Sequence, residues 1–293
     1  MNATGPVGYA NEEPAHAPPW HGLVVWDVFF NALTTGLFMT TAVGELTRPE
    51  LVAPVAVWAY PLALVLLLID LTLLVLDLGD PLRFHHMLRV FKPSSPMSLG
   101  TWCLTLYSLP LTLVVAVEAL VLVGVLPDLS GAVGWVHKIA LVVALPFAFG
   151  SMAYKGVLFS TSAQPGWREA RWFGAYHVAS AFALGSATLL GLATASGHHE
   201  AVRALWPAGS ALAVIQLVPL GFLATELRTA LATRYARSAL GATAVAIGAG
   251  ALVPLALFPF GGASVIAAAI LVLGGGWVVR ALVVMLPAVH EAK

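Results

Sequence analysis

Charged side chains are scarce in this chain. Asp, Glu, Lys and Arg make up 10% of its 293 residues, whereas 59% of the residues are hydrophobic. Soluble domains carry about 25% charged residues, so this composition excludes a water-soluble globular domain and indicates a protein solvated by lipid. The 14 basic and 14 acidic side chains balance each other, which leaves no basic excess for binding nucleic acid.

Cysteine is almost absent as well. An iron–sulfur cluster needs about four protein ligands, normally cysteine thiolates, and the chain has only Cys103. The sequence therefore excludes a cluster within this chain, and it excludes an internal disulfide. A membrane haem needs two histidines at the same depth, yet His137 and His177 fall near opposite faces of the membrane. The His85–His86 pair has no accompanying cysteine or carboxylate pattern, so we predict no haem and no metal site.

Long hydrophobic runs dominate what is present. Each is about 20 residues or longer, which matches a hydrocarbon core about 30 Å thick. The sequence predicts an all-α, polytopic integral membrane protein with about eight transmembrane helices, at residues 22–44, 54–77, 99–126, 133–158, 171–194, 204–225, 238–258 and 263–287. This transmembrane domain, 22–287, lies between an extramembrane segment, 1–21, and a C-terminal tail, 288–293. Segment 1–21 has no Lys or Arg, so it does not resemble a secretory signal.

The distribution of basic residues predicts the orientation. An even number of spans places both chain ends on one side of the membrane, which we call face N. Face N also carries the loops at 78–98, 159–170 and 226–237. It then holds nine Lys and Arg residues, whereas the opposite face holds three, at Arg48, Lys138 and Arg203. The positive-inside rule therefore predicts that face N is cytoplasmic.

Ionisable residues inside the predicted spans are functional candidates, because a charge within the bilayer costs at least about 2.5–3.5 kcal/mol. Asp27, Asp77, Tyr154 and His177 all fall at span ends on face N. Asp70 precedes Asp77 by two helical turns, so it lies on the same side of its helix and about 10 Å deeper. The sequence thus predicts a polar cluster in the face-N third of the membrane.

A second ionisable group falls nearer the opposite face. Glu118 lies two-thirds of the way along the third span, at a depth similar to that of His137 and Lys138 on the fourth. Deep ionisable residues in membranes often form proton relays. Glu118, His137, Lys138 and Asp70 therefore form a candidate proton pathway. A buried ion pair between Glu118 and Lys138 is the structural alternative.

Two stretches of the chain carry recognisable motifs. Residues 76–84 read Leu-Asp-Leu-Gly-Asp-Pro-Leu-Arg-Phe, and residues 92–102 read Lys-Pro-Ser-Ser-Pro-Met-Ser-Leu-Gly-Thr-Trp. A second match begins at Tyr154-x-Gly156-Val-Leu-Phe-Ser and continues to Pro165-x-Trp167. These motifs resemble the signature of the NrfD/PsrC family, the membrane subunits of polysulfide-reductase-type complexes. The predicted helix count agrees as well, so the resemblance covers most of the chain.

The resemblance implies a quinone-binding membrane anchor of a multi-subunit oxidoreductase in the prokaryotic cell membrane. Such a subunit exchanges electrons between the quinone pool, menaquinone or ubiquinone, and an iron–sulfur (ferredoxin-like) partner, and it is not catalytic alone. A further subunit, usually a molybdopterin protein, often handles the other substrate. In the family, the quinone pocket uses polar groups at the start of the first helix and a tyrosine on the fourth. Asp27 and Tyr154 occupy those regions in this chain, and many family members meet an exported partner on the outer face.

The resemblance and the depth pattern together give two predicted sites. Asp27, Asp77, Tyr154 and His177 are expected to line the quinone site. The 78–98 loop is basic and rich in proline, and it is expected to dock the iron–sulfur partner through Arg83, His85, His86, Arg89 and Lys92.

A proton-coupled transporter or channel is the competing class, because it would use the same buried carboxylates without a quinone. Inverted repeats with broken helices would favour it, and the sequence shows no clear repeat. Lys155 and Arg280 also lie within predicted spans. Each is either a functional residue or a residue whose side chain only snorkels toward the membrane surface.

Overall fold

The computed structural model describes residues 22–78, 80–164, 166–235, 241–242 and 245–287, and every regular element in these ranges is helical. Within these ranges, seven helices are long and apolar enough to cross a membrane, and a shorter apolar helix covers Val245–Phe260. The prediction of an all-helical, multi-pass membrane protein is therefore confirmed. The predicted terminal segments, 1–21 and 288–293, lie outside the described residues.

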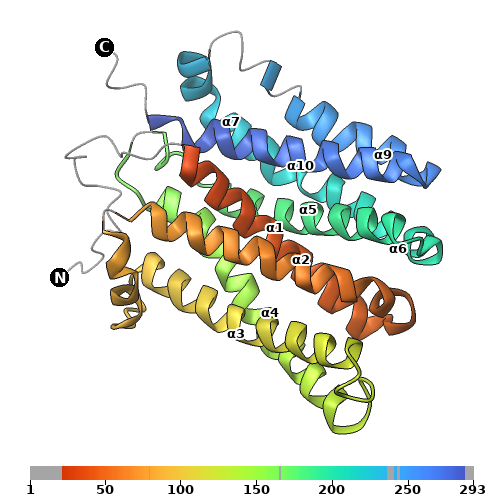
Figure 1. Cartoon of the computed structure of the whole chain (residues 1–293). Coiled ribbons are helices and arrows are strands. Elements are labelled where there is room, and N and C mark those ends of the chain that lie inside the picture. The colour runs from red at the N-terminus through yellow and green to blue at the C-terminus, as the bar shows by residue number, and fades with distance from the viewer. Residues whose placement is uncertain (1–21, 79, 165, 236–240, 243–244, 288–293) are drawn as a thin grey trace, which may run out of the picture.

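The helices run alongside one another between two ends of the molecule (Figure 1). In chain order they are α1 Gly22–Thr47, α2 Pro49–Leu76, η1 Pro81–Leu88, α3 Pro96–Leu122, α4 Gly131–Ser160, α5 Phe173–Ala195, α6 His199–Ile215, α7 Leu217–Tyr235, η2 Val245–Leu252, α9 Val253–Leu257, η3 Phe258–Phe260 and α10 Ala263–Val284. The start of α1 and the end of α10 lie at the same end of the bundle, together with η1 (Figure 1). That end corresponds to face N.

The sixth membrane crossing is longer than predicted and is interrupted. The predicted span was 204–225, whereas one apolar stretch of helix covers His199–Thr233. It breaks at Gln216, between α6 and α7. Pro219 lacks the N–H that would bond the carbonyl of Ile215, and α6 ends at that residue. The predicted seventh span, 238–258, falls partly outside the described residues.

Helix α1 is the centre of the bundle. In the most apolar 18-residue stretch of α1, 78% of the residues are buried, whereas 33% are buried in the corresponding stretches of α2, α3 and α4. Gly36 brings α1 against α5, since a Cβ added at Gly36 would lie 1.9 Å from the carbonyl oxygen of Ala181. Small residues permit such close helix contacts in membranes, and they place the polar side chains of α1 within reach of neighbouring helices.

Candidate functional site

The ammonium of Lys155 lies between two carboxylates inside the bundle. Its Nζ is 2.6 Å from Oδ1 of Asp27 and 2.9 Å from Oδ1 of Asp70. The three side chains come from α4, α1 and α2. Their exposed fractions are 3% for Lys155, 11% for Asp27 and 0% for Asp70. The ammonium therefore does not snorkel to the surface, and each of its two carboxylate contacts is a charge-assisted hydrogen bond.

Asn31 and Ser151 extend this group, which we call the Lys155 cluster. Nδ2 of Asn31 donates to Oδ2 of Asp70 at 3.0 Å and contacts Oγ of Ser151 at 3.1 Å. Asn31 follows Asp27 by one turn on α1, and Ser151 precedes Lys155 by one turn on α4, so each helix presents two polar groups on one face. Oδ1 of Asn31 is buried and has no hydrogen-bond partner among the described residues. The cluster thus holds one unsatisfied acceptor.

A pocket opens beside the Lys155 cluster toward face N. Three of the four predicted quinone-site residues meet at it: Asp27, Asp77 and Tyr154 line the wall together with Lys155. The remaining lining is apolar and consists of Val24, Val28, Leu74, Met97, Leu158 and Phe159. The cavity between the walls measures about 40 Å³. Ligand pockets combine apolar walls with a few polar groups, as this one does, but they typically measure about 300–1,000 Å³, so the walls must move apart to admit a ligand of ordinary size.

Tyr154 is held in the pocket wall by a glycine on α3. A Cβ added at Gly100 would lie 2.1 Å from Cδ2 of the Tyr154 ring, so only glycine leaves room for the ring in this position. The Tyr154 side chain is buried, yet its hydroxyl makes no hydrogen bond with another residue in the described part of the chain. The hydroxyl is therefore available to a ligand. Gly100 belongs to the first sequence motif, and this contact connects it to the second.

His177 was predicted to lie with these residues, but it does not line this pocket. Its depth matches that of Tyr154, but the ring is fully buried on α5, with its centroid 5.8 Å from that of Phe173. Neither ring nitrogen has a hydrogen-bond partner among the described residues. Arg280 is buried as well, so it does not snorkel. Its guanidinium donates to Oγ of Ser180 at 2.8 Å and to the carbonyl of Gly276 at 2.9 Å.

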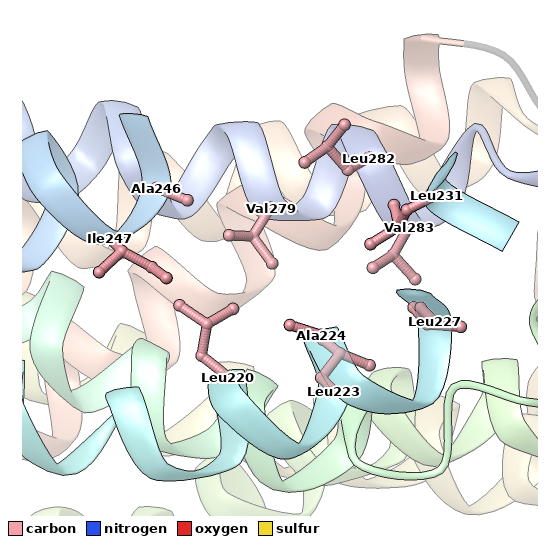
Figure 2. A pocket seen from close by; sticks show the side chains of 10 residues that line it. All are labelled: Leu220, Leu223, Ala224, Leu227, Leu231, Ala246, Ile247, Val279, Leu282 and Val283. Atoms are coloured by element: carbon pink, nitrogen blue, oxygen red, sulfur yellow. The ribbon is translucent and has the colours of Figure 1, made fainter. Parts of the chain in front are cut away.

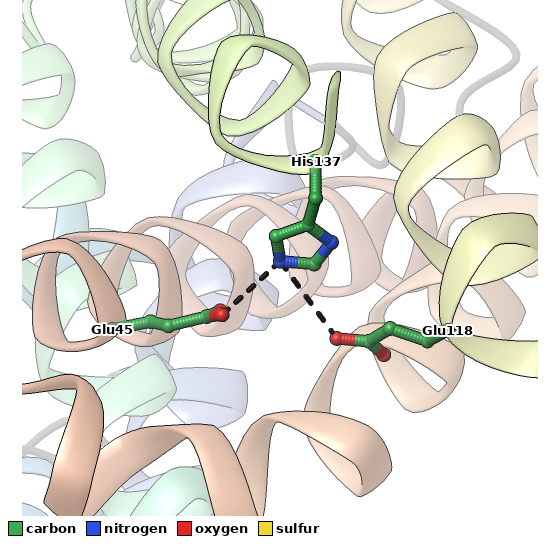
Figure 3. Close-up of side chains that lie close together, drawn as sticks. All are labelled: Glu45, Glu118 and His137. Carbon is green, nitrogen blue, oxygen red and sulfur yellow. Dashed lines mark hydrogen bonds and ion pairs between the residues drawn. The ribbon is translucent and has the colours of Figure 1, made fainter. Parts of the chain in front are cut away.

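A second ionisable group lies at the other end of the bundle, and three of its side chains are shown in Figure 3. Nε2 of His137 is 3.1 Å from Oε1 of Glu45 and 4.0 Å from Oε1 of Glu118. The hydroxyl of Tyr60 donates to Oε2 of Glu45 at 2.5 Å. These four residues, on α1, α2, α3 and α4, are named the Glu45 cluster. Lys138 is exposed and makes no ion pair within the described residues, so the alternative Glu118–Lys138 pair is wrong.

The two clusters do not touch. Between them, Oγ1 of Thr34 donates to the carbonyl of Ala63 at 2.6 Å and lies 3.0 Å from the hydroxyl of Tyr107. Of the predicted proton pathway, Glu118 and His137 belong to one cluster, and Asp70 belongs to the other. A route between Glu118 and Asp70 stays a prediction.

Two of the four polar groups that the sequence reasoning missed lie on α1. Asn31 and Glu45 were not predicted, although they share a helical face with Asp27 and Thr34. The signal was their spacing, since steps of four, three and eleven residues keep a side chain on one face of an α-helix. Ser151 and Tyr60 gave no comparable signal, because single hydroxyls are common in membrane helices.

The predicted docking loop is exposed at face N. Arg83, His85, His86, Arg89 and Lys92 are all exposed, and Arg83 pairs with its neighbour Asp80 at 3.0 Å. Large apolar side chains are exposed between them, namely Leu82, Phe84, Val90 and Phe91. The loop joins α2 to α3, whose adjoining residues Leu74, Asp77 and Met97 line the pocket. A protein docked on this loop would therefore lie next to the pocket.

A different cavity lies between α7, η2 and α10 (Figure 2). Its ten lining side chains are all apolar: Leu220, Leu223, Ala224, Leu227, Leu231, Ala246, Ile247, Val279, Leu282 and Val283. No side chain in its wall carries a group that could orient or protonate a reacting molecule. The pocket beside the Lys155 cluster is therefore the candidate reaction site.

Comparison with protein-family models identifies a match over most of the chain. The family described as "Polysulphide reductase, NrfD" matches residues 11–290, which is nearly the whole chain. No curated protein matches this chain. The family match covers both the α1 and α4 residues of the Lys155 cluster and the complete docking loop.

Proposed function

Because the chain belongs to the NrfD family of membrane subunits of oxidoreductase complexes, we propose that it exchanges electrons between the membrane quinone pool and an iron–sulfur partner docked on face N. The pocket that adjoins the Lys155 cluster is the proposed quinone or quinol site. The observation that carries this proposal is the convergence of Asp27, Asp77 and Tyr154 on one apolar-walled pocket at the base of the docking loop.

The pocket residues fit a quinone head group. A quinone ring presents two carbonyl oxygens on an apolar ring, and it would supply two-electron, two-proton chemistry when bound. The hydroxyl of Tyr154 has no partner among the described residues, so it is free to donate a hydrogen bond. Lys155 also lines the pocket, while Val24, Val28 and Leu158 give it apolar walls. The isoprenoid tail would remain in lipid.

The Lys155 cluster would exchange the protons of this chemistry. Nζ of Lys155 bridges Oδ1 of Asp27, at the pocket, and Oδ1 of the deeper Asp70. A proton gained at Asp27 would leave Lys155 paired one-to-one with Asp70, and a proton lost there would leave two carboxylates facing one ammonium. Asn31 keeps the second oxygen of Asp70 oriented by its 3.0 Å hydrogen bond.

The exposed docking loop supports the partner assignment. Members of this family generally work with iron–sulfur and molybdopterin subunits, and a cluster-bearing subunit must approach the quinone closely to exchange electrons. Exposed apolar side chains rimmed by basic ones mark protein interaction sites. Leu82, Phe84 and Phe91 alternate with Arg83 and Arg89 on this loop. We place the complex in the prokaryotic inner membrane, with face N in the cytoplasm on the basis of its basic residues.

A second candidate function is proton-coupled transport without a quinone. The buried polar side chains of α1, from Asp27 through Asn31 to Thr34, favour it, because such side chains often mark ion pathways in membranes. Purification under mild conditions distinguishes the two. A redox subunit retains quinone and an iron–sulfur protein, whereas a transporter retains neither.

The Tyr154→Phe variant tests the quinone site directly. It keeps the ring against Gly100 and removes the hydroxyl, so we expect quinol turnover to fall about two- to tenfold, the worth of one hydrogen bond, with complex assembly unchanged. Tyr176→Phe is the matched control, since it removes a buried hydroxyl on α5 outside the pocket. Unchanged turnover and quinone affinity in Tyr154→Phe would remove this residue from the site.

A further inference from the structure

Three metal-binding side chains converge near the face opposite the quinone pocket. Oxygen atoms of Glu45 and Glu118 and a ring nitrogen of His137 all lie within 4.8 Å of one another. The three residues come from α1, α3 and α4, and their side chains point toward one common space (Figure 3). They lie far apart in the sequence, so only the packing of three helices brings them together.

The charges in this group are not matched by the protein. Two carboxylates face a single imidazole, and the side chains of Glu118 and His137 are 7% and 3% exposed. Oε2 of Glu118 is buried without a hydrogen-bond partner among the described residues. A buried carboxylate oxygen without a partner is costly, because it loses hydration and gains no bond in return. A divalent cation would neutralise both carboxylates and give the free oxygen a ligand bond.

We propose that Glu45, Glu118 and His137 form a binding site for a first-row divalent metal ion of the Zn²⁺ class. One imidazole nitrogen with two carboxylates is a donor set that Zn²⁺ accepts, with a fourth position open to water. Bonds of about 2.0–2.1 Å in a tetrahedral site place ligand atoms about 3.3 Å apart. The Glu45–His137 separation of 3.1 Å is already close to this value. Glu118 lies 4.0 Å from the imidazole nitrogen and within 4.8 Å of the Glu45 oxygen, so it must move inward by about 1–1.5 Å.

The surroundings of the three ligands support the site and set its strength. Tyr60 fixes the Glu45 carboxylate by donating to its second oxygen, and the Tyr60 ring lies edge-on to the His137 ring with centroids 6.2 Å apart. Nδ1 of His137 has no partner among the described residues. Metal-bound histidines usually donate from this second nitrogen, and losing that bond costs about 10–100-fold in affinity. The site is therefore a moderate-affinity one.

The position of the ligands indicates what the ion does. Glu45 is two residues from the end of α1 and partly exposed, so an ion enters from the aqueous side opposite face N. Once bound, it joins α1, α3 and α4 at the end of the bundle opposite the docking loop. This role is structural and does not depend on the proposed quinone chemistry.

Titration of the purified full-length chain with ZnCl₂, followed by calorimetry, tests the proposal. We expect one Zn²⁺ per chain, an increase in melting temperature, and at least a tenfold loss of affinity in Glu118→Gln and in His137→Gln. The partly buried His198 and the exposed His199 offer a rival site, so the His198→Ala/His199→Ala variant is the control at the same face, and it should bind Zn²⁺ as the wild type does.

Wild-type protein provides a second readout in case the cluster variants fail to fold. Co²⁺ in a tetrahedral nitrogen–oxygen site gives intense visible absorption, and Zn²⁺ added afterwards should remove it. The proposal is overturned if wild type binds no Zn²⁺, if only the His198→Ala/His199→Ala variant loses it, or if bound Co²⁺ shows only the weak spectrum of an octahedral, water-rich site. In those outcomes the Glu45 cluster is only a hydrogen-bonded group.

Discussion

The three charges of the Lys155 cluster do not contribute equally to stability. One ammonium faces two carboxylates, so removing different members leaves different imbalances. Lys155→Met leaves Asp27 and Asp70 as two buried carboxylates whose oxygens were 2.6 and 2.9 Å from the lost ammonium. Removing one partner from a buried ion pair costs about 3–5 kcal/mol, because the remaining charge is uncompensated. We expect Lys155→Met to fall in or above this range.

Asp27→Asn is the informative comparison. It leaves Lys155 and Asp70 as a one-to-one pair, so only one charge-assisted hydrogen bond is lost, and the expected cost is about 1.5–3 kcal/mol. The fully neutral variant Lys155→Met/Asp27→Asn/Asp70→Asn should regain much of what Lys155→Met loses, since replacing all members of a buried ionic group by neutral residues is often tolerated.

Reversible unfolding in mixed micelles, with increasing SDS and helix content as the signal, measures these differences. The expected order of destabilisation is Lys155→Met, then Asp70→Asn, then Asp27→Asn, because Asp70 also accepts a hydrogen bond from Asn31 and is less exposed than Asp27. If Asp27→Asn destabilises the protein as much as Lys155→Met, the charge imbalance does not control stability and the reasoning fails.

Three further predictions concern the pocket, the docking loop and the topology. Gly100→Ala should displace the Tyr154 ring, since the added Cβ would lie 2.1 Å from it, and quinol turnover should fall at least as far as in Tyr154→Phe. Gly221→Ala, where no atom lies within 4 Å of the new Cβ, should leave turnover unchanged, and equal turnover in both glycine variants would disprove the contact. Arg83→Glu/Arg89→Glu should release the iron–sulfur partner during mild detergent purification while Arg48→Glu retains it. Full retention by the loop variant would mean that the loop is only solvated. Reporter fusions at residues 10 and 290 should report the same side of the membrane, and opposite sides would require a different number of crossings.

The hydrophobic runs were sufficient to predict the helices, but they were less precise about the ends. α2 begins at Pro49 rather than at 54, and α3 begins at Pro96 rather than at 99. Both starts follow the preference of proline for the first helical turn, where its missing N–H costs nothing. Ser95 adds a cap by accepting a hydrogen bond from the N–H of Ser98. These local signals lie outside the hydrophobic run, so hydropathy alone does not register them.

Depth was predictable for the candidate site, whereas rotation about each helix axis was not. Counting residues from span ends correctly placed Asp27, Asp77 and Tyr154 at face N, and they line one pocket. The same count placed His177 beside them, although its side chain packs against Phe173 instead. Consecutive residues differ by about 100° around a helix, and only packing decides which of them faces a given neighbour. For the same reason, the sequence alone does not decide whether Lys155 has a functional role or only snorkels toward the membrane surface.

The polar face of α1 gives a physical reason for the arrangement of both clusters. Asp27 and Asn31 find their partners on α2 and α4, Thr34 finds them on α2 and α3, and Glu45 finds them on α2 and α4. In a membrane, apolar side chains give a helix little preference for one rotation over another, because lipid tails and neighbouring helices are about equally apolar. A buried polar group without a partner is costly there. A rotation of α1 by one residue would separate all of these pairs at once. The same polar residues that build the two candidate sites therefore also fix the orientation of the central helix, so substitutions on this face should be judged for stability before they are interpreted as losses of function.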